Sequence, residues 1–310
     1  MIENININPE QIAKKRGINK RKLKENVKGW GVVGPIVLYY FIFGLYPLWL
    51  LIKYSFHAED MYFNLEFVGF KNYIEIFTNS EYYVLMLNTL LIAIFTIGFS
   101  LVLGMGLALL MTGPIKGKGV YRTIYYLPVI ISMAIVSQIV NVWLGYNNGA
   151  LNNIIDSLGG SRVMWKDSTF WMYFWIILIC LWKGLGATLI LLVAGLTGIP
   201  AEIHEAAEVD GATSWVKFFK ITLPQLKHML VFVMITSIIG AFNVFEPVQL
   251  ISGGGPNEST EVILFKIYNE AFQGGNIGVA NALSMVVLVI LMALTALNMR
   301  IDKEKEEKAK

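Results

Sequence analysis

The sequence predicts an all-α, polytopic membrane protein with six transmembrane helices and both termini in the cytoplasm. Hydrophobic residues make up 55% of the 310 residues and charged residues only 15%, whereas an average soluble domain carries about 25% charged residues. The apolar residues gather in six continuous stretches, and the basic residues lie mostly on one side of them. These observations exclude the two soluble domains that the length alone would suggest.

Each predicted span is long enough to cross the roughly 30 Å hydrocarbon core of a bilayer. In chain order the spans are 29–52, 85–110, 123–145, 169–199, 229–251 and 271–299. Barrel strands alternate apolar and polar residues, so these continuously apolar stretches favour helices. Lys183 in the fourth span and Glu246 in the fifth are the charged residues that interrupt them.

Basic residues predict the orientation, because cytoplasmic loops carry the excess of Lys and Arg. The segment 1–28, the loops after the second and fourth spans and the tail 300–310 hold most of the 25 Lys and Arg residues. Four basic residues lie in the opposite loops: Lys71, Arg162, Lys166 and Lys266. We therefore expect a basic cytoplasmic segment at 1–28, a membrane domain at 29–299 and a cytoplasmic tail.

Two features of the termini and the composition limit the other readings. The first apolar stretch is long and has no small-residue cleavage site, so we expect an anchor rather than a signal peptide. Its basic flank is better explained by topology and anionic lipid than by nucleic acid. Cys180 is the single cysteine and the three histidines lie far apart, which argues against a disulfide framework or a metal centre.

The loop at 197–228, between the fourth and fifth spans, is too long for a simple connection. Pro200 can occupy the first position of a helix, where its missing N–H costs nothing. Gly211 can close that helix in the left-handed conformation. A second short helix would be capped by Thr213 or Ser214 and would end before Pro224.

The first of these two helices has small and acidic residues on its surface. Three carboxylates follow one another at intervals of three: Glu202, Glu205 and Glu208. Together with Ala206, Ala207 and Ala212, they suit insertion into a basic groove on another protein. The alternative is an amphipathic helix on lipid, which acidic residues beside an anionic leaflet disfavour.

At these residues the sequence resembles the EAA loop of binding-protein-dependent ATP-binding-cassette importers. The matching residues are Glu205, Ala206, Ala207, Asp210, Gly211, Ala212, Ile221, Leu223 and Pro224. Three flanking segments, 67–73, 125–128 and 253–256, resemble carbohydrate permeases of the maltose and glycerol-phosphate type. The resemblance covers roughly residues 30–299 and implies a MetI-like, type I importer permease fold in the bacterial cytoplasmic membrane.

The resemblance also implies a mechanism and partners. The EAA segment would be a coupling helix in which Glu205 contacts a basic residue of an ATPase subunit, Ala206 and Ala207 line the contact, and Gly211 provides the bend. The partners would be a homologous second permease, two ATPases, an extracytoplasmic solute-binding protein and a sugar, such as an oligosaccharide. ATP and Mg²⁺ would bind the ATPases, so this chain would need no cofactor and would be no enzyme.

Near-matches to catalytic motifs do not change this expectation. His204 and Glu205 begin like the zinc-protease motif HExxH, but position 208 is Glu instead of the second His. The segment 250–254 resembles a signature loop of the ATPases, yet it falls on the predicted outer side, where no nucleotide is available. We therefore expect the partner, not this chain, to hydrolyse ATP.

The polar residues of the last spans are candidates for a substrate pathway. A charge within the bilayer costs at least about 2.5 kcal/mol, so Lys183 and Glu246 need partners or water. Pro247 should break the fifth span and free a carbonyl group. Asn243, Glu246 and Gln249 would then share one face beside aromatic residues, which suits a sugar.

Two residues of the sixth span, Asn281 and Ser284, repeat this spacing and could face the same cavity. The alternative is that these polar groups only bond neighbouring helices, which we favour for Ser284. For Lys183 we favour a structural role, either paired with Glu246 or with a group on a second subunit.

A self-sufficient secondary carrier or channel remains the alternative function. It predicts internal repeats and paired charges in each half, which the sequence does not show, and it leaves the 197–228 loop unexplained. A membrane hydrolase would need a His/Asp/Ser constellation in the spans. The absence of Arg and of Lys clusters in the spans disfavours a highly anionic sugar.

Overall fold

The computed structural model describes residues 30–31, 33–59 and 65–307. The predicted basic segment 1–28 lies outside them. The chain divides into two compact units, Met1–Lys53 and Tyr54–Lys310, which are described separately. Among the described residues, four helices are long and apolar enough to cross a membrane, and the number rises to six if two bent pairs each count as one span. This confirms the predicted all-α membrane fold, with the number of spans reaching six only when each bent pair is counted as one span.

The described part of the first unit forms an apolar helix, which belongs to the candidate span Val33–Tyr54. It includes a π turn, η1 (Phe41–Leu45), followed by α3 (Tyr46–Tyr54). Large apolar side chains are exposed all round this helix. Such a helix is stable only when lipid or other protein surrounds it, as expected for the predicted span at 29–52.

The second unit opens with a small antiparallel sheet that the sequence did not predict. β1 (His57–Glu59) pairs with β2 (Leu65–Phe67), and α4 (Lys71–Thr78) follows. The buried amide of Asn72 donates a 2.9 Å hydrogen bond to the backbone carbonyl of Ser55, which fixes α4 beside the sheet. Strands of three residues are too short to show an alternating pattern.

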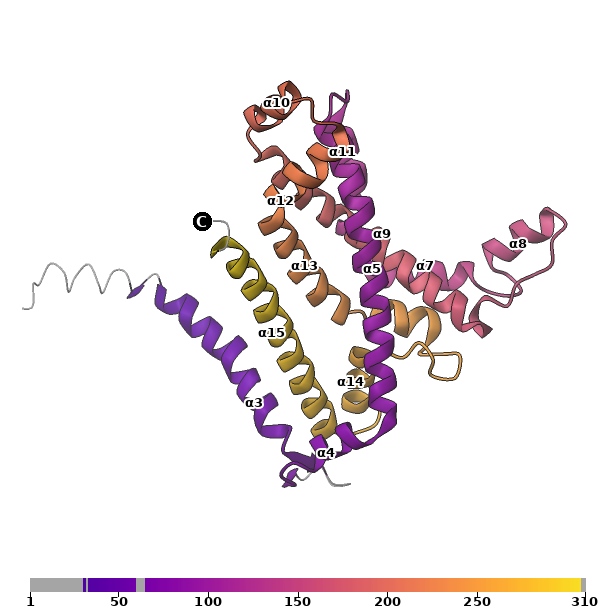
Figure 1. Ribbon diagram of the computed structural model, residues 1–310. Coiled ribbons are helices and arrows are strands. Elements are labelled where there is room, and N and C mark those ends of the chain that lie inside the picture. The colour runs from indigo at the N-terminus through magenta and orange to yellow at the C-terminus, as the bar shows by residue number, and fades with distance from the viewer. Residues whose placement is uncertain (1–29, 32, 60–64, 308–310) are drawn as a thin grey trace, which may run out of the picture. The chain divides into compact units, whose positions relative to one another are not determined.

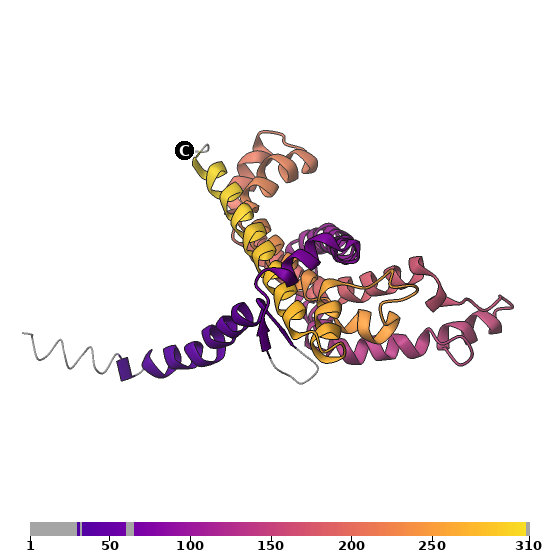
Figure 2. The same cartoon turned by 90° about the horizontal axis from the view of Figure 1, so that it is seen from below.

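The remaining elements of the described chain are helical. In order they are α5 (Ser80–Thr112), α6 (Lys118–Ile130), α7 (Met133–Trp143), α8 (Ala150–Ser157), η2 (Trp165–Asp167), α9 (Thr169–Thr197), α10 (Ala201–Val209), α11 (Ser214–Lys217), η3 (Phe218–Thr222), α12 (Leu223–Gln225), α13 (Lys227–Phe242), η4 (Val248–Ser252), α14 (Ile263–Phe272) and α15 (Ile277–Glu307). Within this unit α5 runs from α4 at one end to α10 and α11 at the other (Figure 1). Both views show α7 and α8 extending to one side (Figure 2).

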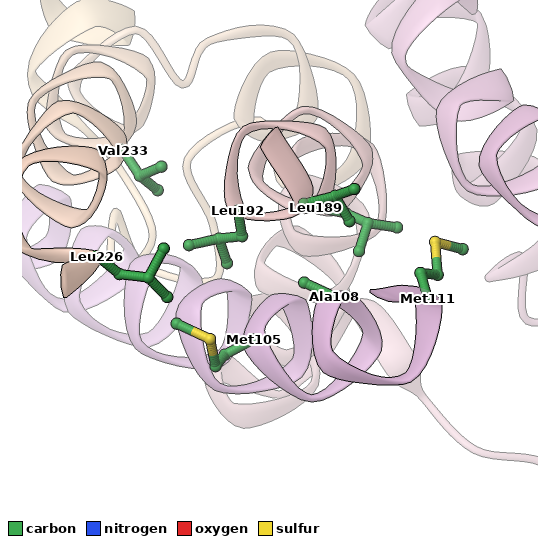
Figure 3. Close-up of a cluster of buried hydrophobic side chains, with 8 residues drawn as sticks. Met105, Ala108, Met111, Leu189, Leu192, Leu226 and Val233 are labelled. Atoms are coloured by element: carbon green, nitrogen blue, oxygen red, sulfur yellow. The ribbon is translucent and has the colours of Figure 1, made fainter. Parts of the chain in front are cut away.

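The core is organised around α5 and α9. Gly104 lets the two helices approach, because a Cβ atom there would lie 3.0 Å from a methyl carbon of Thr188. The hydroxyl of Ser100 donates a 3.0 Å hydrogen bond to the Thr188 hydroxyl. Small residues and hydroxyl pairs of this kind are typical of helix packing in membranes. Toward the α10 end the two helices meet α13 in one apolar cluster, formed by Met105, Ala108, Met111, Leu189, Leu192, Val193, Leu226 and Val233 (Figure 3).

The predicted third span, 123–145, consists of two helices rather than one, so that prediction is wrong in this respect. α6 and α7 meet at 85°, with Ile131 and Ser132 in extended conformations between them. Pro128 contributes to the break because it lacks an N–H group to donate within α6. α6 instead packs closely on α9, where a Cβ atom on Gly186 would lie 2.2 Å from the carbonyl oxygen of Tyr125.

The boundaries of the last two spans also differ from the prediction. The fifth, predicted at 229–251, consists of α13, a short break and η4. The sixth does not start at residue 271: α14 ends at Phe272, and the chain turns through Gly275 at φ +70° before α15 begins. Apolar content alone does not reveal this turn, because residues on both sides of it are apolar.

An ion-pair cluster joins α5 to α14 at the α4 end of the unit. The ammonium group of Lys266 binds the carboxylates of Glu81 and Glu270, the latter at 3.2 Å. Burial acts to lower the pKa of Lys266, but the hydrogen bonds to both carboxylates outweigh it and hold that pKa above its ordinary value. Nearby, the pKa of the buried Glu261 carboxyl is raised, chiefly by burial.

Candidate functional site

The 197–228 loop folds as two helical segments around a glycine bend, as predicted. Pro200 is the cap of α10, one residue before the predicted position. At the other end the N–H of Gly211 bonds to the carbonyl of Glu208 at 3.0 Å, and the N–H of Ala212 to that of Ala207 at 2.9 Å. This is a Schellman motif, and Gly211 adopts the left-handed conformation that it requires, at φ +74°.

The second segment is longer than predicted. The side chain of Thr213 accepts a 3.4 Å hydrogen bond from the N–H of Val216, which confirms it as the cap. The segment continues beyond Pro224, because the π turn η3 precedes α12 and Pro224 lies in the first turn of α12. The prediction that it ends before Pro224 is therefore wrong: proline is tolerated where a new turn begins.

The structure places the predicted coupling residues on different sides of α10. Glu205 and Ala206 are exposed, and so are Asp210 and Gly211 at its end. Ala207 is only 7% exposed, so in this conformation it packs within the chain rather than facing outward. The exposed part of the EAA segment is therefore the Glu205 and Ala206 side.

Glu208 has a partner within the chain. Its carboxylate accepts a 2.6 Å hydrogen bond from the ammonium group of Lys217 on α11. That hydrogen bond lowers the pKa of Glu208. From its spacing, Glu208 was predicted to have the same role as Glu202 and Glu205, as a carboxylate for a basic partner. In the structure it instead joins the two helical segments across the glycine bend.

A cavity of about 280 Å³ lies between α5, α9 and the end of α13. Three of the predicted pathway residues line it together: Lys183, Asn243 and Glu246. Hydroxyl groups that the sequence analysis did not single out add to its lining, on Thr96, Ser100, Thr188, Thr236 and Ser237. Single hydroxyls in apolar spans cannot be told from packing residues by sequence, because most bond to their own helix.

The break in the fifth span carries two of these residues into the cavity lining. α13 ends at Phe242, and helical structure resumes at Glu246. Pro247 accounts for the position of the break, because its ring clashes with the carbonyl of the residue four before it, Asn243. The break lies on the N-terminal side of Pro247, so Asn243 and Glu246 face the cavity from separate segments rather than from one helical face.

Lys183 is held by the broken third span. Its ammonium group donates to the carbonyl oxygens of Pro128 at 3.4 Å, of Val129 at 3.3 Å and of Ile131. α6 ends here, so these carbonyls lack the helical donors they would otherwise have. Among the described residues, no ion pair joins Lys183 to Glu246, which corrects one of its expected pairings. The favoured structural role agrees with this geometry.

The remaining candidates do not line this cavity. Gln249 lies half-buried in η4. The amide of Asn281 donates a 2.7 Å hydrogen bond to the carbonyl of Ile277, one turn back in α15. The hydroxyl of Ser284 bonds in the same way to Ala280 at 2.8 Å, as expected for a structural residue.

Comparisons with known proteins agree with this architecture. Residues 100–303 match the family described as "Binding-protein-dependent transport system inner membrane component". The chain is 30% identical over 277 residues to the sulfoquinovosyl glycerol transport system permease protein SmoG of Agrobacterium fabrum, covering 89% of this chain and 90% of that protein. It is 28% identical over 290 residues to the trehalose/maltose transport system permease protein MalF of Thermococcus litoralis, covering 93% and 98%.

The fold is also found among solved structures. One of them is the crystal structure of a bacterial ATP-binding-cassette transporter involved in import of the acidic polysaccharide alginate. A chain of that transporter superposes on this chain with a TM-score of 0.79. The match covers 92% of this chain and 98% of that chain at 24% identity, and it shows a shared fold. Because the family match spans about two thirds of the sequence, the chain belongs to the inner-membrane components of binding-protein-dependent transport systems.

Proposed function

We propose that this chain is a permease subunit of an ATP-driven importer that moves a sugar, such as an oligosaccharide, into a bacterial cell by alternating access. The relatives described above carry names that refer to sugars or sugar derivatives. In this proposal the chain spans the cytoplasmic membrane with α10 and both termini on the inner side. The energy comes from separate ATPase subunits, so the chain itself performs no hydrolysis.

The connection between α10 and the cavity carries this proposal. α9 leads directly into α10, and α11 and α12 lead from it into α13. α9 contributes Lys183 to the cavity lining, and α13 ends at Phe242, directly before Asn243. A force applied to α10 therefore reaches two walls of the cavity through short covalent connections. This is the arrangement that an external motor needs in order to open the cavity alternately to each side.

The surface of α10 fits a protein partner better than lipid. Glu205 and Ala206 are adjacent and exposed. Glu205 offers a carboxylate, and the small side chain of Ala206 lets a partner's surface approach closely. The Schellman motif at Gly211 fixes the direction of the next segment, and the Glu208–Lys217 ion pair ties the two segments together. We infer that α10 moves as a rigid body when a basic groove of an ATPase subunit holds it.

Purification of the tagged chain from its own host in mild detergent tests the proposal. We expect an ATPase and a second, homologous permease to copurify with the chain, and a solute-binding protein to complete the transporter. Proteoliposomes holding the purified complex should take up labelled oligosaccharide only when ATP and the binding protein are both present. Uptake by the chain alone, driven by an ion gradient, would overturn the proposal in favour of a secondary carrier.

A further inference from the structure

The charge of the cavity lining limits which sugars can pass. We propose that Glu246 makes this subunit's side of the cavity selective for uncharged sugars over those that carry carboxylate, sulfonate or phosphate groups. The inference rests on the proposed function, because it concerns the substrate of the same pathway. It assigns to Glu246 the part of a specificity-determining residue.

The Glu246 carboxylate is available to a ligand. It lines the cavity and is half-buried. Among the described residues, none hydrogen-bonds to this carboxylate or forms an ion pair with it. A carboxylate accepts hydrogen bonds and cannot donate them while ionised. Sugar hydroxyl groups can donate to it, and such bonds to an ionised acceptor are stronger than bonds between neutral groups.

The cation in the cavity lining does not compensate for this carboxylate. Lys183 is the one basic residue among the described residues that line the cavity. An ammonium group has three hydrogens, and three backbone carbonyls accept from Lys183. Those carbonyls end α6, where the helix dipole is negative and offsets part of the ammonium charge. Lys183 thus uses its three hydrogens to bond the backbone at the helix break and offers no free donor to a substrate anion.

The rest of the lining suits neutral hydroxyls. Asn243 is exposed at the cavity, and Thr236 and Ser237 lie one to two turns before it on α13. The hydroxyl of Thr96 is buried and has no hydrogen-bond partner within the described chain. The Thr236 hydroxyl donates to the carbonyl of Phe232 at 3.0 Å and the Asn243 amide donates one hydrogen to Ile239 at 2.8 Å. Thr236 can therefore accept from a ligand, while Asn243 keeps its second amide hydrogen and its carbonyl oxygen, so the lining offers both donors and acceptors, as a polyol requires. An acidic sugar would bring a second anion toward Glu246 in a site of low dielectric constant, which like charges oppose strongly.

Reporter cysteines measure the charge of the cavity independently of which sugar is carried. In the Cys180→Ala background of the complete transporter, Asn243→Cys and Ser237→Cys each provide one thiol in the cavity lining. Methanethiosulfonate reagents of opposite charge then react at rates that depend on the local potential, and the uncharged methyl reagent gives the baseline for access. Each rate is also divided by the rate of the same reagent with a free thiol in solution, which removes the intrinsic preference of a thiolate for cations. We expect the cationic-to-anionic ratio to remain above one after both corrections.

Removing the charge should change this ratio. We expect Glu246→Gln to lower the cationic-to-anionic rate ratio by at least about tenfold, since a unit charge within roughly 12 Å of the thiol contributes about 1.4 kcal/mol or more at an effective dielectric constant of about 20. The matched control is Glu75→Gln, which removes an exposed carboxylate on α4, outside the cavity lining. An unchanged ratio in Glu246→Gln, or an equal change in Glu75→Gln, overturns the inference.

An uptake panel separates this inference from the proposed function. The complete transporter in proteoliposomes, with its binding protein, is offered maltotriose and trigalacturonate, which have the same number of rings and differ in charge. ATP-dependent uptake of the neutral sugar alone supports the inference. Uptake of trigalacturonate at a rate equal to or above that of maltotriose overturns it while sugar import stands. ATP-dependent import of a solute other than a carbohydrate would overturn the proposed function instead.

Discussion

The ammonium group of Lys183 on α9 donates a hydrogen bond to the carbonyl oxygen of Ile131, at the break between α6 and α7. Two further carbonyls at the end of α6 accept from the same group. One side chain therefore satisfies backbone groups that the 85° bend leaves without helical donors. This relationship explains how a lysine and a broken helix, each unfavourable alone in a membrane, are stable together.

Removing the amine of Lys183 should destabilise the protein. Lys183→Met keeps a similar length but leaves the carbonyls of α6 without donors, and we expect a loss of about 2 kcal/mol, typical of hydrogen bonds to a charged group. The midpoint of thermal unfolding in detergent should fall by several degrees. Lys183→Arg, which keeps donors, should lose less. Equal midpoints for Lys183→Met and the wild type would contradict this account.

Two glycines on α9 allow a matched test of helix packing. Gly186→Ala places a methyl group 2.2 Å from the Tyr125 carbonyl oxygen, whereas Gly184→Ala meets no atom within 4 Å. We expect the first variant to lose about 3 kcal/mol through overpacking and the second to be neutral or slightly more stable. Expression level and thermal midpoint should distinguish them, and similar values for the pair would argue against the α6–α9 contact.

Charge reversal on α10 should uncouple ATP hydrolysis from transport. Glu205→Lys is expected to abolish ATP-dependent uptake while the protein still accumulates in the membrane, because the exposed carboxylate is proposed to bind a basic partner. Gly211→Asp should do the same by forcing a side chain into the left-handed conformation, which costs roughly 1–2 kcal/mol. Glu75→Lys, at the other end of the unit, is the control. Normal uptake by Glu205→Lys would remove the coupling role.

The stability that the Glu208–Lys217 ion pair contributes should depend on pH, and exchanging the two charges should preserve the pair. The pKa of Glu208 is lowered by its hydrogen bond to Lys217, so the pair stabilises the fold above the ordinary glutamate pKa. That stabilisation is lost as the pH falls through the lowered value. Glu208→Lys should weaken uptake, and the exchange Glu208→Lys with Lys217→Glu should restore it. A failure of the exchange to restore uptake would mean that Glu208 itself contacts the partner.

The buried Glu261 carboxyl gives a pH effect of opposite sign. Burial raises its pKa, so the folded state binds the proton more tightly than the unfolded state. Its cost to stability is present at neutral pH and is relieved as the pH falls through the raised pKa. We expect the thermal midpoint to rise as the pH falls from neutral towards the ordinary glutamate pKa, and Glu261→Gln to flatten that rise. A parallel rise in the variant would assign the effect to other carboxyls.

Long and continuous patterns in the sequence predicted most of the fold. α5 and α9 follow the predicted second and fourth spans closely, since each is an uninterrupted apolar run. The glycine bend at Gly211 was predictable because a helix end with a left-handed residue strongly favours glycine. The 85° bend of the third span was not, since the carbonyl groups that it frees are satisfied by Lys183, a residue 52 positions from Ile131.

The charged and amide side chains of the cavity lining could be predicted from the sequence, whereas its hydroxyl groups could not. Asn243, Glu246 and Lys183 stood out because polar groups in apolar spans are costly and therefore few. Their helical spacing suggested that Gln249 belongs with them, yet the break before Pro247 ends that periodicity. The uncharged lining hydroxyls, such as Thr236 and Ser237, gave no signal, because their orientation depends on how α13 packs against its neighbours.

The contact between Lys183 and the end of α6 has a consequence for the insulation of the membrane. Unpaired carbonyl groups inside a bilayer attract water, and a chain of ordered water can conduct protons. An ammonium group seated on those oxygens occupies the places that water would take and repels a passing proton. We expect this contact to help the cell keep its proton gradient while the transporter is idle.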